Sequence, residues 1–416
     1  MFTRSLANGE GLAGAFTALI RRTHGIHQMV ETRQVAQWLH DHGNDPQVGA
    51  LATGLVAYRM GLRPFAWQRL SQLPTEMWLE HAPGEYVLLA GQHDVELAEQ
   101  AVADALAHTG PVSAATWLSL TRRAMGLGVG DQCIALAERF DEAARAEIAA
   151  GGLTAAEESR LEVNRRWMSR WAPRVAAGPV TPSPATEGAV AIGVLGYDQP
   201  DPRNTSRNIG DYVQTVASLS HLVRHTGARF DDGELGRFAT ELAQRVPADL
   251  RIDSPDVPVT LHQIDRDAAS YSEAPDGTWL LAFGWYAHKL GGVRYDFPFP
   301  RHLRPIYVSF HVNRRDMLTD EAIEHLRAHA PIGCRDHSTV DLLLGLDIPA
   351  FFSGCLTTTV RYVRPDDAPE RPAGAPTVWI DLPAPKGGRR VRNERNDVRR
   401  SSMVDNLRTA LASIDD

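Results

Sequence analysis

The chain has 416 residues, which is longer than one average domain and predicts two or three domains. Hydrophobic residues make up 43% of it, charged residues 23%, and the net charge is -8, so the chain is globular and a nucleic-acid partner has no electrostatic support. No apolar run approaches the roughly 20 residues of a membrane-spanning helix, so no membrane span is expected. Three cysteines without metal-type spacing predict reduced thiols, no metal site and a cytoplasmic location.

Residues 1–177 predict an all-helical domain, because apolar residues recur every three or four positions and strand-type alternation is nearly absent. Met60-Gly61-Leu62 recurs as Met125-Gly126-Leu127, each at the end of an expected helix, which suggests repeats of tetratricopeptide type. An irregular helical bundle fits the pattern equally well. The expected helices are Leu12–Arg22, Thr32–His42, Pro46–Met60, Val95–His108, Ser113–Met125, Asp131–Ala149 and Ala155–Trp171.

Residues 178–188 are rich in proline and small residues and predict a semi-rigid linker. Residues 189–370 then alternate short apolar strands with helices, which predicts an α/β lobe with a mostly parallel sheet whose ligands bind at the carboxyl ends of the strands. Residues 371–416 are expected to begin a second lobe or to form a tail. The expected elements are Val190–Tyr197, Asp211–His225, Val257–Gln263, Trp279–Tyr286, Ile306–Val312, Asp320–Ala330, Ile332–Cys334, Thr339–Leu346, Ala350–Ser353, Thr377–Leu382 and Ser402–Ile414.

The first candidate site follows the apolar strand at residues 191–197, where Asn208-Ile209-Gly210-Asp211 opens a helix. Asn208 or Asp211 can cap that helix, and Gly210 permits a turn that other residues resist. Amides at a helix start attract anions such as phosphate or carboxylate. The alternative interpretation is a tight turn with a cap and no ligand.

The second candidate site follows the short strand Ile332–Cys334, where Arg335 and Asp336 stand before a helix that Ser338 or Thr339 starts. The carboxyl end of a parallel strand exposes such side chains to ligands. Alternatively, Asp336 only caps the helix while Arg335 pairs with a neighbouring carboxylate.

Together these segments resemble the glycine-asparagine-x-glycine-aspartate and arginine-aspartate-x-x-serine/threonine signatures of the polysaccharide pyruvyl transferase family. The similarity covers about residues 189–363 and includes the order and separation of Asn208–Asp211 and Arg335–Thr339. Arg207 stands where the family usually has glycine, which loosens the placement of an anion cradle at the first motif.

The resemblance implies a Rossmann-like lobe of the GT-B type. It implies an enzyme that transfers the enolpyruvyl group of phosphoenolpyruvate to paired hydroxyls of a surface polysaccharide, forming a cyclic ketal and releasing phosphate without a cofactor. Asn208, Gly210, Arg335 and Asp336 would then bind the substrate anion, and Asp211 would be an orienting carboxylate.

His288 and His311 are the candidate acid–base groups of that reaction, because each lies at the end of an expected strand, and a histidine without a catalytic role is the alternative for both. Trp285 can stack on a sugar ring or belong to the core.

Little sequence follows residue 370, so the resemblance predicts either a fragment of a longer protein or a remnant without catalysis. Two other functions fit the sequence. One is a GT-B glycosyltransferase that uses a nucleotide sugar, and the other is a non-catalytic adaptor whose helical domain binds a protein partner.

Overall fold

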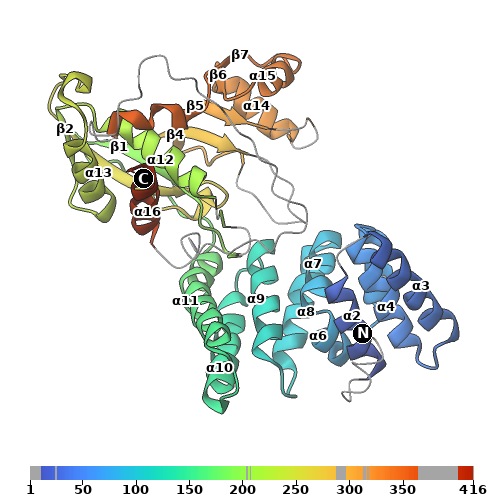
Figure 1. Ribbon diagram of the computed structural model, residues 1–416. Helices are drawn as coiled ribbons and strands as arrows, with labels where there is room; N and C mark the ends of the chain where they lie inside the picture. The colour runs from blue at the N-terminus through green and yellow to red at the C-terminus, as the bar shows by residue number, and fades with distance from the viewer. Residues whose placement is uncertain are drawn as a thin grey trace. The chain divides into compact units, whose positions relative to one another are not determined.

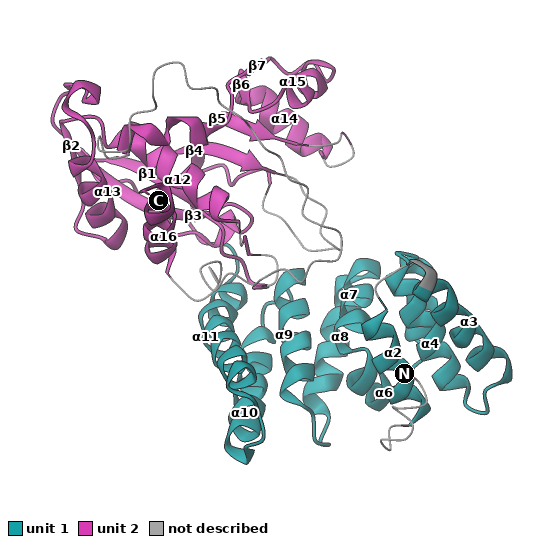
Figure 2. Cartoon of the chain, in the orientation of Figure 1, with its two compact units in different colours: residues 1–179, 291–294 teal, residues 180–290, 295–416 magenta. Residues whose placement is uncertain are grey.

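The computed structural model describes residues 11–23, 26–202, 205–206, 208–286, 297–312, 315, 318–363 and 402–415. The chain forms two compact units (Figure 2). Unit 1 comprises residues 1–179 and 291–294, and unit 2 comprises residues 180–290 and 295–416. The division at residue 179 falls within the Pro-rich segment. In the described residues, no helix combines the length and apolarity needed to cross a membrane.

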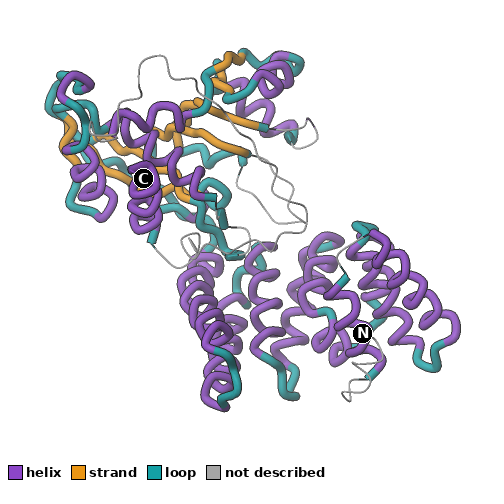
Figure 3. The backbone as a smooth tube through the Cα atoms, in the orientation of Figure 1, coloured by secondary structure: helices purple, strands orange, loops and turns teal. Residues whose placement is uncertain are grey.

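The described part of unit 1 is built from helices, and successive helices lie side by side (Figures 1 and 3). The pairs α3 and α4, α7 and α8, α9 and α10, and α10 and α11 each pack together. The helices are α2 (Leu12–Arg22), α3 (Ile26–His42), α4 (Pro46–Arg59), α5 (Arg63–Leu70), α6 (Thr75–His81), α7 (Pro83–His93), α8 (Val95–Ala107), α9 (Ala114–Leu127), α10 (Cys133–Ala150) and α11 (Ala155–Ala177).

Glycine and proline positions explain where these helices depart from the sequence prediction. Gly61 has a left-handed φ of 78° between α4 and α5, whereas Gly126 lies inside α9 and Gly128 makes the turn there with a φ of 75°. The two Met-Gly-Leu segments are therefore not equivalent turns. Helix α11 continues past Pro173 to Ala177, because the buried Trp171 side chain holds this part of the helix in the core.

Helices α5, α6 and α7 were not predicted from the sequence. They are short, and each lies next to a proline that divides the apolar pattern. In α5 and α7 the proline occupies the first turn, where its missing N–H costs no helical hydrogen bond.

Among the described residues of unit 2, seven strands form one parallel sheet in the order β2-β3-β1-β4-β5-β6-β7. The strands are β1 (Val190–Gly196), β2 (Ala228–Phe230), β3 (Val257–Asp265), β4 (Thr278–Trp285), β5 (Leu303–His311), β6 (Ile332–Cys334) and β7 (Ala350–Phe352). The helices are α12 (Ile209–Leu222), α13 (Glu234–Gln244), α14 (Asp320–Ala328), α15 (His337–Leu344) and α16 (Met403–Asp415). This is the α/β lobe that the alternation of strands and helices predicts.

Both faces of the sheet are buried against separate hydrophobic clusters. Neighbouring residues of β1 point to opposite faces, so Val194 belongs to a cluster with α12, α13 and α16, and Leu195 belongs to one with α14 and α15. The core therefore leaves the ends of the strands as the place where polar side chains gather.

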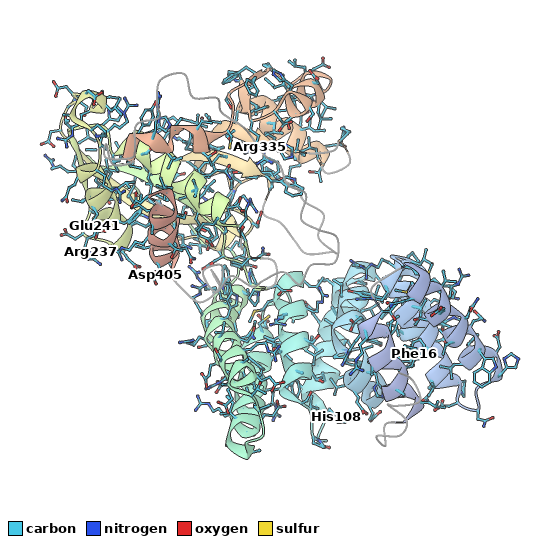
Figure 4. The ribbon with its side chains drawn as sticks, in the orientation of Figure 1. Phe16, His108, Arg237, Glu241, Arg335 and Asp405 are labelled. Atoms are coloured by element: carbon cyan, nitrogen blue, oxygen red, sulfur yellow. The ribbon has the colours of Figure 1, made fainter. Side chains whose placement is uncertain are left out.

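Helix α16 is an integral part of unit 2. Its Met403, Val404 and Leu407 side chains are buried in the cluster that α12 and α13 share. On its outer side, Arg408 Nη2 lies 3.0 Å from Glu241 Oε1 of α13, and Figure 4 labels Glu241 there. The last described helix thus covers the same lobe as the sheet.

We expect Leu407→Ala to destabilise unit 2 by about 2–5 kcal/mol, because it removes a fully buried side chain and leaves a cavity. The urea midpoint of the full chain should fall. The hydrogen-exchange rate of the α12 amides should rise. Thr409→Ala, on the exposed side of the same helix, is the control and should change neither. Equal behaviour of the two variants would show that α16 does not support the lobe.

Candidate functional site

The parallel sheet brings both motifs predicted from the sequence to one edge. Strand β1 ends at Gly196 and leads toward α12, while β6 ends at Cys334 and leads directly into α15. Strands β4 and β5 lie between them, so the ends of β1 and β6 are about 14 Å apart at the usual strand spacing. The motifs share an edge but do not touch, and the strand ends between them complete the candidate site.

A histidine–aspartate pair lies at the ends of β5 and β6. His311 Nδ1 is 2.5 Å from Asp336 Oδ2 and 3.1 Å from Thr339 Oγ1. Asp336 also caps α15, because its Oδ1 accepts hydrogen bonds from the Thr339 amide at 2.9 Å and the Ser338 hydroxyl at 2.5 Å. Within the described residues, His311 Nε2 has no hydrogen-bond partner and is the ring nitrogen that a substrate can reach.

The hydrogen bonds around Asp336 keep its carboxylate charged. Burial alone raises its pKa, but hydrogen bonds from Ser338, Thr339 and His311 outweigh burial and lower the pKa from 3.8 to about 2. A charged carboxylate on Nδ1 fixes the orientation of the imidazole ring. The predicted capping role of Asp336 and a role in orienting His311 therefore coexist in one side chain.

An extra residue in β5 decides which way His311 faces. Ala282 and Gly284 of β4 pair with Tyr307 and Phe310 of β5, so β5 has one residue more than β4 between these pairs. Ser309 takes up this bulge with a left-handed φ of 60°, and its amide donates to Ser353 Oγ at 2.9 Å. In a regular strand Tyr307 and His311 would share a face, whereas the bulge places them on opposite faces.

A cation and an aromatic ring flank this pair. Arg335 Nε lies 4.0 Å from Asp336 Oδ2, and 30% of the Arg335 side chain is exposed, so it can also meet an anion from solvent (Figure 4). The Trp285 ring at the end of β4 meets the His311 ring edge to face at 6.0 Å. The predicted residues His311, Arg335 and Asp336 thus form one group.

The first motif forms a separate group at the start of α12. Asn208 Oδ1 accepts a hydrogen bond from the Gly210 amide at 3.1 Å, so that amide is already used for capping. The Asp211 carboxylate accepts a short hydrogen bond from Ser206 Oγ and a long one of 3.5 Å from Gln214 Nε2. Asp211 thus holds Ser206 beside the start of α12. Arg207 and His288 lie outside the described residues.

The sequence analysis did not include Arg266, which is central to the end of β3. Its Nε and Nη2 donate to Asp267 at 3.1 and 2.7 Å, and both side chains are about 6% exposed. Although burial lowers the pKa of the guanidinium, the Asp267 carboxylate beside it raises that pKa above its ordinary value. The run Asp265-Arg266-Asp267 directly after a strand is the signal that could have identified this pair.

Among the described residues, acidic side chains outnumber this arginine at the ends of β1 and β3. Asp198, Asp265 and Asp211 each lie close enough to the Tyr212 hydroxyl to add to the increase in its pKa that burial causes. Gly196 is needed beside them, because a Cβ there would lie only 2.7 Å from Asp265 Oδ1. This half of the edge is therefore unfavourable for an anion, in contrast to the half with Arg335.

Among the described residues, neither a metal centre nor the hollow in unit 1 provides an alternative site. In the described residues, no group of three or more His, Cys, Asp or Glu side chains is arranged to hold a metal ion. In unit 1, a hollow of about 500 Å³ is lined by residues 106–110 and by Trp117, Arg139 and Glu142. Its lining mixes both charges with apolar groups, so it selects no ligand class.

The chain was compared with protein-family models, curated proteins and solved structures, and none of the three comparisons found a match. The chemistry of the sheet edge is therefore the ground for a functional proposal.

We expect Asp336→Ala to lower the free energy of unfolding by about 1 kcal/mol at pH 7, the usual cost of losing an N-cap. The loss should shrink as the pH falls from 3.8 toward about 2, because protonation of the wild-type carboxylate removes the same stabilisation. Urea denaturation across this pH range measures it.

Thr319→Ala, which removes the neutral cap of α14, is the matched control. Its cost should not change with pH. A pH-independent cost for Asp336→Ala would contradict a charged cap.

Proposed function

We propose that unit 2 is the first lobe, of GT-B type, of a cytoplasmic pyruvyltransferase-like enzyme. It would transfer the enolpyruvyl group of phosphoenolpyruvate to paired hydroxyls of a surface-polysaccharide sugar. Two C–O bonds form at the enolpyruvyl carbon that bears the phosphate, and its bond to the phosphate oxygen breaks. One hydroxyl proton ends on the methylene carbon, which becomes a methyl group, and the other leaves with phosphate.

The observation that carries this proposal is the hydrogen bond between His311 and Asp336 at the carboxyl edge of a parallel sheet. The reaction needs a group that takes a proton from a hydroxyl and another that gives one to carbon. With Nδ1 held by a carboxylate, His311 Nε2 can exchange protons in either direction. Its position at the end of β5 agrees with the acid–base role that its place at a strand end predicts.

The charges near this pair support an anionic donor. Arg335 follows β6 directly and is partly exposed, so its guanidinium can bind the phosphate or carboxylate of phosphoenolpyruvate. Trp285 next to His311 offers an aromatic edge for a sugar ring. In this proposal Asp211 acts indirectly, by holding Ser206 beside the start of α12.

We expect His311→Asn to lower kcat for phosphate release from phosphoenolpyruvate by roughly 10²–10⁴-fold, the usual contribution of a general acid–base group. Arg335→Met should mainly weaken the binding of phosphoenolpyruvate, which phosphorus NMR measures. His225→Asn is the control, because His225 is an exposed histidine near the amino edge of the same sheet. It should leave both measurements unchanged.

If the chain is instead a glycosyltransferase that uses a nucleotide sugar, the same assay should give a different result. UDP-glucose would then displace phosphoenolpyruvate or bind in its place. Binding of UDP-glucose without any binding of phosphoenolpyruvate would refute the pyruvyltransferase proposal. Binding of neither compound would leave Arg335 without the predicted anion and would also refute it.

A further inference from the structure

The bulge in β5 is held by a side chain that follows another strand. Ser309 is fully buried, and its amide donates a hydrogen bond of 2.9 Å to the hydroxyl of Ser353, directly after β7. The same hydroxyl donates to the Cys334 carbonyl oxygen of β6 at 3.1 Å. Ser353 therefore connects the carboxyl ends of β5, β6 and β7, and it supplies an acceptor for a buried amide that the bulge takes out of the regular ladder.

Gly333 allows the Ser353 side chain to reach β5. Strand β6 lies between β5 and β7, so this side chain passes over β6. A Cβ at Gly333 would lie 3.1 Å from the Ser353 Cβ, which is closer than the roughly 3.5–4.0 Å at which carbon atoms pack. The missing side chain at Gly333 thus provides the space in which the hydroxyl meets the bulge.

The loop after β7 holds the bulge at a second point. Ser309 Oγ accepts a hydrogen bond of 3.2 Å from the amide of Leu356, whose side chain is buried in the core beside α14 and α15. The left-handed φ of 60° at Ser309 is costly for a residue other than glycine. The two hydrogen bonds from this loop offset that cost and keep the bulge in place.

We propose that Ser353 is a positioning residue, which directs the His311 ring toward Asp336 by holding the bulge in β5. His311 lies two residues after Ser309, and its side chain takes the face opposite to Tyr307 because of the extra residue. Ser353 thus acts through the backbone of β5. Its effect on catalysis rests on the proposed function, whereas the orientation of His311 can be measured without any substrate.

The test follows the Nδ1 proton of His311 by NMR in the full chain. In the wild type this proton should give a resonance far downfield, because the hydrogen bond to Asp336 is short and charge-assisted. His311→Asn identifies the resonance, since that variant lacks it. Ser353→Ala leaves the buried Ser309 amide without its acceptor, so the bulge should relax and the resonance should disappear or move upfield. Ser353→Thr keeps the hydroxyl and should restore the resonance.

Ser272→Ala is the matched control. The Ser272 hydroxyl accepts a hydrogen bond of 2.9 Å from the Asp265 amide, so this variant loses the same kind of bond at the end of β3. It should lower the urea midpoint about as much as Ser353→Ala and leave the His311 resonance unchanged. If Ser353→Ala does not fold, Ser353→Cys takes its place, because a thiol has a similar size but accepts hydrogen bonds weakly. The resonance should then move upfield.

The kinetic consequence is a loss of kcat without a comparable change in KM. In Ser353→Ala, kcat for phosphate release should fall roughly tenfold to a hundredfold, because a small displacement of an acid–base group is that costly. KM for phosphoenolpyruvate should stay nearly constant, since Arg335 is unchanged. The proposal is overturned if the wild type lacks the downfield resonance, if Ser353→Ala keeps it, or if Ser353→Thr behaves like Ser353→Ala.

Failure of the positioning role and failure of the proposed function give different results. A resonance that depends on Ser353, together with no turnover of phosphoenolpyruvate by the wild type, would sink the pyruvyltransferase proposal and keep the positioning role. Turnover of phosphoenolpyruvate with an unchanged resonance in Ser353→Ala would do the reverse.

Discussion

The parallel direction of every strand in the sheet is the constraint on which the candidate site depends. Because all strands run the same way, the residues after β1, β3, β4, β5 and β6 must meet at one edge. Both faces of the sheet are buried, so polar side chains placed directly after the strands have only this edge to occupy. Asp211, Arg266, His311 and Arg335, far apart in the chain, gather there for that reason.

Charge divides this edge into two halves. Near β5 and β6, Arg335 is partly exposed. The Asp336 carboxylate in contact with His311 is held in place because it also caps α15. Near β1 and β3, the acidic side chains that the structure describes outnumber Arg266, which is already bound to Asp267. The half with Arg335 is therefore the one that suits the anionic donor of the proposed reaction.

The sequence predicted most of the fold of unit 2, because buried parallel strands appear as short apolar runs separated by polar loops. Ile332–Cys334 is predicted to the residue, and Arg335 and Asp336 follow from it. The direction of His311 could not be predicted, since it depends on one extra residue at Ser309 that only pairing with β4 reveals. Arg266 was missed because a charged residue after a strand usually implies solvent, whereas here two tyrosine rings and Asp267 enclose it.

Backbone strain and a buried ion pair argue that the edge is built for more than stability. Within the described strands, a left-handed φ occurs only at Gly284 and Ser309, on adjacent strands beside the candidate site. A buried ion pair rarely stabilises a fold more than apolar residues of the same size would. The pair does, however, fix the orientation of the Arg266 guanidinium at the end of β3. A buried ion pair beside two strained strand residues contributes little to stability alone, so a functional role explains this edge better.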